Sequence, residues 1–208
     1  MQSKRTASET GQGQSDQEQA GSQDAASPAR AYCPVEQEWV AVHDTAPQNS
    51  ELSLRAWRLS DAPVLRRLLD DPEMWRFLPE RFHGVMSDAD ARDLIRLKHA
   101  TAHHIVQAIS SGDEIVGQVR LEFEPGRPQR IGELSYWIGK RYWGKGLAST
   151  ILPRFTSALF TDLPHLLQIE ARVHPDNTAS AHVLRKSGFA YQEKREDADG
   201  RHVYARRR

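Results

Sequence analysis

Residues 133–160 read ELSYWIGKRYWGKGLASTILPRFTSALF, and this stretch decides the fold of the chain. Leu134, Tyr136 and Ile138 alternate with Glu133, Ser135 and Trp137, which predicts a β-strand with Leu134, Tyr136 and Ile138 on its buried face. Two glycines, Gly144 and Gly146, then stand in a short basic turn. Behind the turn, apolar residues recur at helical spacing and predict an amphipathic helix: Leu147, Ile151, Leu152, Phe155 and Leu159.

A strand, a glycine turn and a helix in this order can hold an anionic group. Glycine has no Cβ, so several backbone N–H groups can crowd together at the turn. The first helical turn adds unpaired N–H donors and the positive end of the helix dipole. Arg141 and Lys145 bring positive charges to the same place, and we therefore expect a ligand that carries phosphate. A glycine pair alone is more often an ordinary turn, and the third glycine of a dinucleotide fingerprint is missing.

Two longer segments make the assignment more specific. Residues 141–148, RYWGKGLA, resemble the acyl-CoA-binding turn of the GCN5-related N-acetyltransferase (GNAT) superfamily. The preceding YWIG at residues 136–139 is similar to the variant in its ribosomal-protein alanine N-acetyltransferase branch. Residues 177–189, NTASAHVLRKSGF, resemble a second segment of that branch. The resemblance covers roughly residues 52–205 and rests on two motifs in the expected order.

The resemblance implies an α+β (mixed α/β) fold, in which a splayed, mostly antiparallel sheet is flanked by helices. By resemblance, the pantetheine arm of the ligand lies where the fourth and fifth strands separate. The residue pattern agrees and predicts strands at residues 52–57, 104–110, 114–124, 131–139, 166–173, 189–196 and 202–206. Short turns join the second, third and fourth of them, which we therefore expect to form an antiparallel meander. Helices are predicted after Ser60 or Asp61, after Ser87 or Asp88 with Leu97 on the buried side, after Gly146, and over 176–187. Pro153 predicts a kink or a helix held by packing.

By the same resemblance the glycine turn and its flanks bind acetyl-CoA as a cosubstrate. Asn177 is expected to bind it as well and can also cap its helix, and the Trp143 side chain is assigned to packing. The predicted binding residues are Trp137, Ile138, Arg141, Trp143, Gly144, Lys145, Gly146, Leu147, Ala148 and Asn177.

Transfer of an acetyl group from a thioester to an amine needs a neutral amine, a stabilised oxyanion and a tolerated thiolate. A lysine-type amine has a pKa of about 10.4, so a general base is useful. Glu133 is one candidate base, although a half-solvated strand carboxylate explains it equally well. Glu196 is a second candidate, for which a surface charge is the simpler interpretation. The resemblance assigns to Ser180 the reprotonation of the thiolate, and Leu184 stands where many relatives have a tyrosine acid.

Composition excludes several other classes of function. The 208 residues carry 28 basic and 28 acidic side chains, so the formal net charge is zero. The composition therefore lacks the excess of basic residues that is typical of nucleic-acid-binding proteins. No signal peptide or membrane-spanning run is present, and the single cysteine, Cys33, suits a reducing cytoplasm. His99 and His103 stand four residues apart, but neither a following glutamate nor a cysteine cluster supports a metal site. We expect a cytoplasmic monomer or homodimer.

Residues 1–50 are predicted to form a disordered tail or linker before the domain at 51–208. After Met1, the first thirty residues contain no large apolar side chain that could offset the entropy cost of ordering. Deleting residues 1–30 should therefore leave the melting temperature and the acetyl-CoA affinity unchanged. Thermal unfolding and calorimetry of the shortened chain check this, and a clear loss in either would contradict the prediction.

The sequence leaves the acceptor amine open, because the resembling branch acts on protein N-termini and on small-molecule amines. A non-catalytic acyl-CoA sensor is an alternative from another class, with the tail as its partner-binding segment. Nucleic-acid binding is supported only by Lys4-Arg5 and the terminal Arg206-Arg207-Arg208.

Overall fold

The computed structural model describes residues 52–78, 85–100, 103–126, 128–194 and 200–208. The predicted tail and the candidate base Glu196 lie outside the described residues. In the described part the strands are β1 (Leu52–Arg55), β2 (His104–Ser111), β3 (Glu114–Phe123), β4 (Ile131–Ile138), β5 (Gln168–Val173), β6 (Ala190–Lys194) and β7 (His202–Arg207). The helices are α1 (Ala62–Leu69), α2 (Asp88–Ala100), α3 (Leu147–Asp162) and α4 (Thr178–Lys186), with 3-10 turns η1 (Leu59–Asp61), η2 (Pro72–Trp75) and η3 (Lys140–Tyr142).

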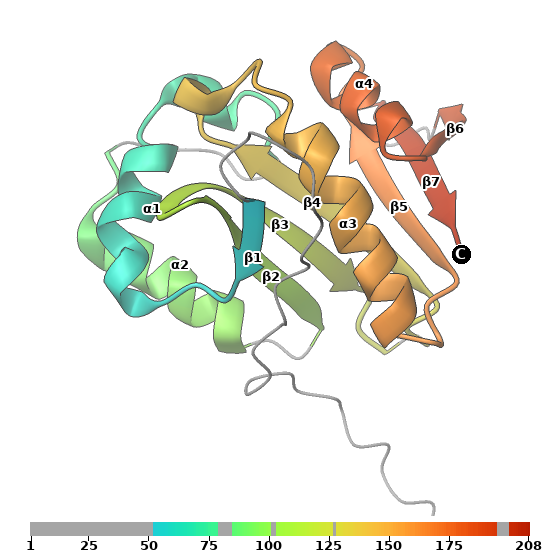
Figure 1. Cartoon of the computed structure of the whole chain (residues 1–208), viewed down its shortest axis with the longest axis horizontal. Coiled ribbons are helices and arrows are strands. Elements are labelled where there is room, and N and C mark those ends of the chain that lie inside the picture. The colour runs from blue at the N-terminus through green and yellow to red at the C-terminus, as the bar shows by residue number, and fades with distance from the viewer. Residues whose placement is uncertain (1–51, 79–84, 101–102, 127, 195–199) are drawn as a thin grey trace, which may run out of the picture. The chain divides into compact units, whose positions relative to one another are not determined.

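The strands form one mixed sheet in the order β1-β2-β3-β4-β5-β7-β6. β1 to β4 pair antiparallel, which confirms the predicted meander of β2, β3 and β4. β4 and β5 are parallel, and their pairing is limited to residues 131–133 against 168–170. Beyond these pairs the two strands diverge toward their C-terminal ends (Figure 1), so the predicted splay between the fourth and fifth strands is confirmed.

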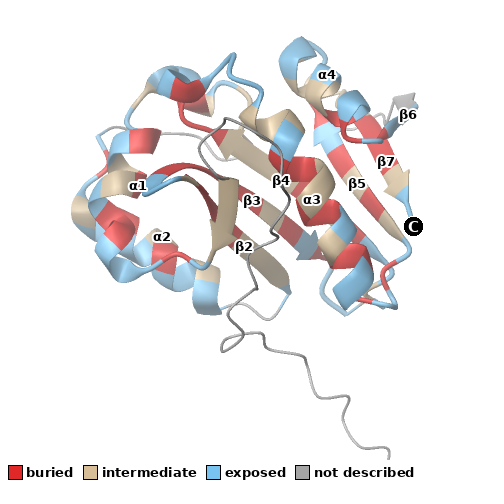
Figure 2. Cartoon of the chain, in the orientation of Figure 1, coloured by how far each residue is buried: buried red, intermediate tan, exposed pale blue. Residues whose placement is uncertain are grey.

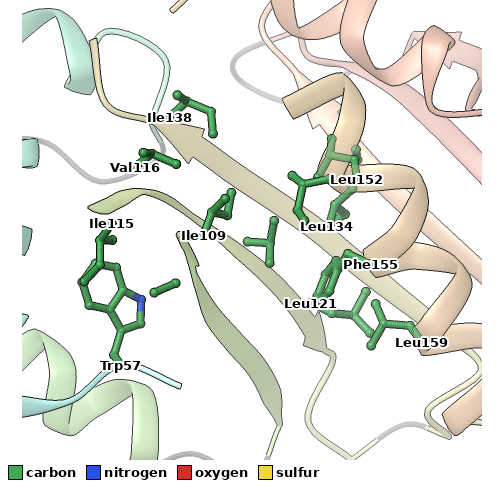
Figure 3. Close-up of a cluster of buried hydrophobic side chains, with 14 of the residues drawn as sticks. Trp57, Ile109, Ile115, Val116, Leu121, Leu134, Ile138, Leu152, Phe155 and Leu159 are labelled. Atoms are coloured by element: carbon green, nitrogen blue, oxygen red, sulfur yellow. The ribbon is translucent and has the colours of Figure 1, made fainter. Parts of the chain in front are cut away.

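Helix α3 covers one face of the sheet beside the splay. Figure 3 shows Leu152, Phe155 and Leu159 of the helix above Leu121 of β3 and Leu134 of β4, and all five are at most 3 % exposed. Each such side chain contributes about 1.5–3 kcal/mol when it is buried. The burial colours of Figure 2 show the same division, with exposed positions of α3 on its solvent side. The predicted apolar stripe therefore anchors the helix to the sheet.

Pro153 lies inside α3, where a missing N–H and ring crowding cost about 3 kcal/mol. The helix nevertheless runs without interruption from residue 147 to 162. Arg206 of β7 donates hydrogen bonds to Thr156 Oγ1 and Ser157 Oγ and reaches the Pro153 carbonyl at 3.4 Å. Of the two expected outcomes, a helix held by its surroundings is the one that the packing and these contacts support.

The last turn of α3 is capped by the C-terminal arginine. Arg208 donates hydrogen bonds to the carbonyl oxygens of Phe160, Leu163 (2.7 Å) and Leu166 (3.1 Å). A guanidinium satisfies orphan helix carbonyls and complements the negative end of the dipole. Arg206 and Arg208 both make contacts within the fold. Two of the three terminal arginines that supported nucleic-acid binding therefore have a structural role.

Replacing Arg208 by methionine should lower the free energy of unfolding by about 2 kcal/mol, because charge-assisted hydrogen bonds are lost. Urea unfolding followed by circular dichroism measures the change. Arg207→Met is the matched control, since the exposed Arg207 contacts the Gln168 side chain at 3.1 Å. Equal stability of the two variants would contradict a capping role for Arg208.

Two helical details differ from the sequence expectation. Leu97 was expected on the buried side of α2, but it is 61 % exposed and that expectation is wrong. The buried residues of α2 are Ala91 and Ile95, and Leu97 lies two positions further, which is about 200° around a helix. Asp61 occupies the N-cap position of α1, yet its carboxylate accepts from Arg55 at 2.7 Å instead of capping the helix.

Candidate functional site

The turn between β4 and α3 has the geometry of an anion cradle. Gly144 and Gly146 have φ angles of +75° and +74°, a left-handed conformation that side chains with a Cβ rarely adopt. A Cβ at either position would meet nothing within 4 Å, so the backbone of the turn borders open space. Gly146 is the N-cap of α3, whose first turn supplies orphan N–H donors. These residues fit a phosphate group.

The positive side chains of the turn gather around the Tyr142 ring. The Arg141 guanidinium carbon lies 4.6 Å and Lys145 Nζ 5.4 Å from the ring centroid. Arg141 is half-exposed and reaches Glu114 at 3.5 Å. Lys140 differs, because its ammonium group is paired with Asp71 at 3.1 Å and with Glu73, both outside the turn. Two of the three neighbouring cations therefore flank the cradle.

The backbone of β4 presents hydrogen-bonding groups to the splay. Gly139 donates its N–H to the Val116 carbonyl of β3 at 2.8 Å. Successive residues of an antiparallel strand direct their N–H and C=O groups to opposite edges. The N–H groups of Ile138 and Tyr136 therefore point away from β3, toward β5. Both residues lie beyond Glu133, the last β4 residue that pairs with β5.

The two predicted tryptophans have different surroundings. The Trp137 side chain alternates with Ile138 and lies on the sheet face opposite α3, where its ring centroid is 6.4 Å from that of Trp57. Trp143 donates from Nε1 to the Ile138 carbonyl at 2.5 Å and is 49 % exposed, so its assignment to packing is wrong. Its indole instead fixes the start of the turn. Leu147 and Ala148 form the half-buried first turn of α3.

Helix α4 places Asn177 and Ser180 beside β4. Asn177 is the N-cap, and its Oδ1 accepts the backbone N–H of Ser180 at 3.0 Å. The Ser180 hydroxyl and the Tyr136 phenol are 2.9 Å apart. Burial raises the pKa of Tyr136 to about 12. Leu184 is fully buried, in agreement with a packing role.

Glu133 belongs to a row of charged side chains on the face opposite α3. Register places Glu122, Glu133 and Glu170 side by side on β3, β4 and β5. Arg172 contacts Glu133 at 2.7 Å, and Arg120 contacts Glu122 at 3.1 Å. We call these five residues the charged row. Burial raises the pKa of the Glu133 carboxyl; the charges of Glu122 and Glu170 raise it further, while Arg172 and Arg120 oppose them.

The charged row and the glycine turn lie at opposite ends of the open strand edge. Glu133 stands where β4 and β5 still pair, and Ile138 lies five residues further along, about 17 Å away at the usual strand rise. On the same face, next to Trp137, are two buried polar atoms, Trp57 Nε1 and Gln118 Oε1. They lack a hydrogen-bond partner in the described part of the chain. Such orphan atoms are costly unless a water or ligand satisfies them.

The structure thus brings most of the predicted residues to one edge of β4. Sequence reasoning missed Tyr136 and Arg172, the direct partners of Ser180 and Glu133. Alternation alone had assigned Tyr136 to a buried strand face, and nothing local distinguished Arg172 from other strand arginines. No cluster of metal-ligating side chains occurs among the described residues. His99 and His104 instead contact the carbonyls of Trp57 and Lys98. In the same residues we find no helix with the length and apolarity needed to cross a membrane.

Comparison with known proteins agrees with this geometry. The profile of the acetyltransferase (GNAT) domain family matches residues 51–190. An uncharacterized N-acetyltransferase, p20 of Bacillus licheniformis, is 31 % identical over 146 residues, which is 66 % of this chain and 78 % of the relative.

Solved structures share the fold. RimL, a ribosomal L7/L12 alpha-N-protein acetyltransferase in complex with coenzyme A, aligns with a TM-score of 0.65 and 22 % identity over 75 % of this chain and 93 % of its own. Mycobacterium smegmatis RimJ, in complex with CoA-disulfide, aligns with a TM-score of 0.65 and 24 % identity over 75 % of this chain and 81 % of its own. Spermidine N-acetyltransferase from Vibrio cholerae, in complex with CoA and spermine, aligns with a TM-score of 0.62 and 21 % identity over 76 % of this chain and 94 % of its own.

The family match covers the strand, turn and helix that form the cradle, together with α4 and the charged row. The predicted splayed α+β sheet is the fold of these relatives. The chain belongs to the GNAT family and is an N-acetyltransferase.

Proposed function

We propose that this enzyme transfers the acetyl group of acetyl-CoA directly to a primary amine, with a free protein or peptide N-terminus as its first candidate acceptor. The observation that carries the proposal is the open edge of β4, which has a phosphate cradle at one end and a carboxylate of raised pKa at the other. An extended donor arm along this edge joins the two ends. No covalent enzyme intermediate is needed, because holding both reactants together supplies much of the rate.

The donor is held mainly by backbone groups. The N–H groups around Gly144 and Gly146 bind the pyrophosphate, and Arg141 and Lys145 add charge. The N–H groups of Tyr136 and Ile138 bind the pantetheine amides or the developing oxyanion, since they point into the splay. Asn177, Leu147 and Ala148 border the same channel. Ser180 lies beside the sulfur of the thioester.

Glu133 acts as the general base for the amine. Its carboxyl is on the face opposite α3, so the acceptor approaches from the side away from the cradle helix. Burial raises the pKa of the Glu133 carboxyl, which makes it a stronger base for any amine. An α-amino group, whose pKa is about 7.7–8.0, is more often neutral near pH 7 than a lysine-type amine at about 10.4. This difference between the two amines favours a protein N-terminus over a polyamine. The RimL relative is described as acting on such an N-terminus.

An acceptor screen tests the proposal. Acetyl-CoA consumption is measured with short peptides bearing free N-termini, with the same peptides blocked at the N-terminus but containing lysine, and with spermidine. We expect kcat/KM for free N-termini to exceed both others by more than about tenfold. Preference for the blocked lysine peptides or for spermidine would contradict the N-terminal acceptor.

The same screen distinguishes the enzyme from the alternative, a non-catalytic acyl-CoA sensor. It predicts tight acetyl-CoA binding by calorimetry and no consumption with any amine. Glu133 supports the catalytic proposal, because a sensor has no need for a carboxyl of raised pKa on the acceptor side.

A further inference from the structure

Tyr136 of β4 and Ser180 of α4 are joined by a hydrogen bond beside the splay. The phenol oxygen and Ser180 Oγ are 2.9 Å apart, and 44 residues separate them in the sequence. Asn177 Oδ1 holds the backbone N–H of Ser180 at 3.0 Å. The serine is therefore fixed at two points, one on its backbone and one on its hydroxyl.

Either hydroxyl can donate in the Tyr136–Ser180 bond, and we take the buried phenol as the donor. Tyr136 is largely removed from water, and burial raises its pKa to about 12, while the Ser180 hydrogen bond acts in the opposite direction. The phenol therefore keeps its proton at neutral pH and needs an acceptor for it. Ser180 Oγ lies at the right distance. When the phenol donates, the hydrogen of the Ser180 hydroxyl is left to donate to a third group.

We propose that Tyr136 is a positioning residue, which directs and polarises the Ser180 hydroxyl toward the sulfur of the acyl donor. The inference rests on the proposed function, in which Ser180 contacts that sulfur. Hydrogen bonds in series strengthen one another in a low-dielectric environment, so the Tyr136 donor makes Ser180 a stronger donor in turn.

The pair acts when the thioester bond breaks. The amine nitrogen has by then bonded to the acetyl carbon and given one proton to Glu133. The bond between the acetyl carbon and sulfur breaks, and its electron pair stays on sulfur. Ser180 donates a hydrogen bond to this charge, and Tyr136 donates one to Ser180. Glu133 then releases its proton to solvent, and the thiolate takes up one proton from solvent. One proton has moved in total from the amine to the sulfur, and Glu133 and both hydroxyl groups end the cycle unchanged.

The test is the acidity of the thiol of bound CoA, read from the ultraviolet absorbance of its thiolate across a pH titration. This readout needs no acceptor amine. A thiolate that accepts a hydrogen bond is stabilised, so the parent enzyme should hold the thiol pKa below the usual value of about 8.5. Ser180→Ala should raise the pKa of the bound thiol by about 1, and Tyr136→Phe by about half as much. The double variant should match Ser180→Ala alone, because Tyr136 acts through Ser180.

Turnover and a matched tyrosine supply the controls. Tyr136→Phe should lower kcat about fivefold while KM for acetyl-CoA stays the same. Tyr204→Phe removes a phenol from β7, where it lies 3.5 Å from Arg185, and should leave the thiol pKa unchanged. An unchanged thiol pKa in Tyr136→Phe, or additive effects in the double variant, would overturn the inference while the proposed function stands. Failure of the parent to bind CoA would overturn both.

Discussion

Replacing Glu133 by glutamine should lower kcat by about a hundredfold to ten-thousandfold near neutral pH, which is the usual contribution of a general base. Glutamine keeps the size and polarity of the side chain but cannot accept the amine proton. The loss should be greatest at low pH, where the acceptor is protonated. Raising the pH supplies neutral amine from solution and should partly rescue the variant. A pH–rate profile with a verified acceptor measures both effects.

The neighbours of Glu133 test the assignment in opposite directions. A general base works only when it is deprotonated, and the pKa of Glu133 is raised. The acidic limb of the pH–rate profile should therefore lie above the ordinary carboxyl pKa of 4.5. Arg172→Met removes the cation 2.7 Å away and should move the limb to higher pH. Glu122→Gln removes a like charge and should move it to lower pH. If Glu133→Gln keeps the parent profile, the base lies elsewhere, and Glu196 or an ordered water becomes the better candidate.

Gly146→Val should weaken acetyl-CoA binding by well over tenfold, equivalent to about 1.4 kcal/mol or more. Valine disfavours the φ of +74° by its β-branch, and its side chain would occupy the open space beside the turn. Both effects remove backbone N–H groups from the phosphate. Gly144→Val, at φ +75°, should behave alike. Isothermal titration calorimetry gives the affinity, and circular dichroism confirms that the fold survives.

A third glycine separates lost binding from backbone strain. Gly126 has φ +77° and equally open surroundings, but it lies in the turn between β3 and β4. Gly126→Val should therefore cost similar stability and leave acetyl-CoA affinity intact. Unchanged affinity in both cradle variants would remove the phosphate-turn hypothesis.

The cradle could be predicted from sequence because its requirements are local. A left-handed turn demands glycine, and alternation followed by helical spacing identifies the strand and helix around Gly144 and Gly146. Local pattern also predicted the antiparallel meander and the N-cap at Asn177. Each of these features depends on residues that are close together in the chain.

The partners of the catalytic candidates could not be predicted, because they come from pairings between distant segments. Alternation placed Tyr136 on a buried face but could not show that α4 brings Ser180 to its phenol. The charged row depends on the register of β3, β4 and β5, which no single strand encodes. The place of β7 between β5 and β6 has the same origin. The expectation for Leu97 was wrong because Leu97 lies about 200° around the helix from the buried Ile95, outside the buried face.

The short pairing of β4 with β5 makes the donor substrate part of the architecture. The N–H groups of Tyr136 and Ile138 point into the splay, where β4 has no neighbouring strand. An extended pantetheine arm would occupy this gap and accept their hydrogen bonds as an additional strand does. Free and bound enzyme should therefore differ in amide hydrogen exchange. We expect the N–H groups of Tyr136 and Ile138 to exchange quickly without CoA and slowly with it, while that of Gly139, bonded to Val116, stays protected throughout. Mass spectrometry or NMR would then record substrate binding as the completion of a sheet.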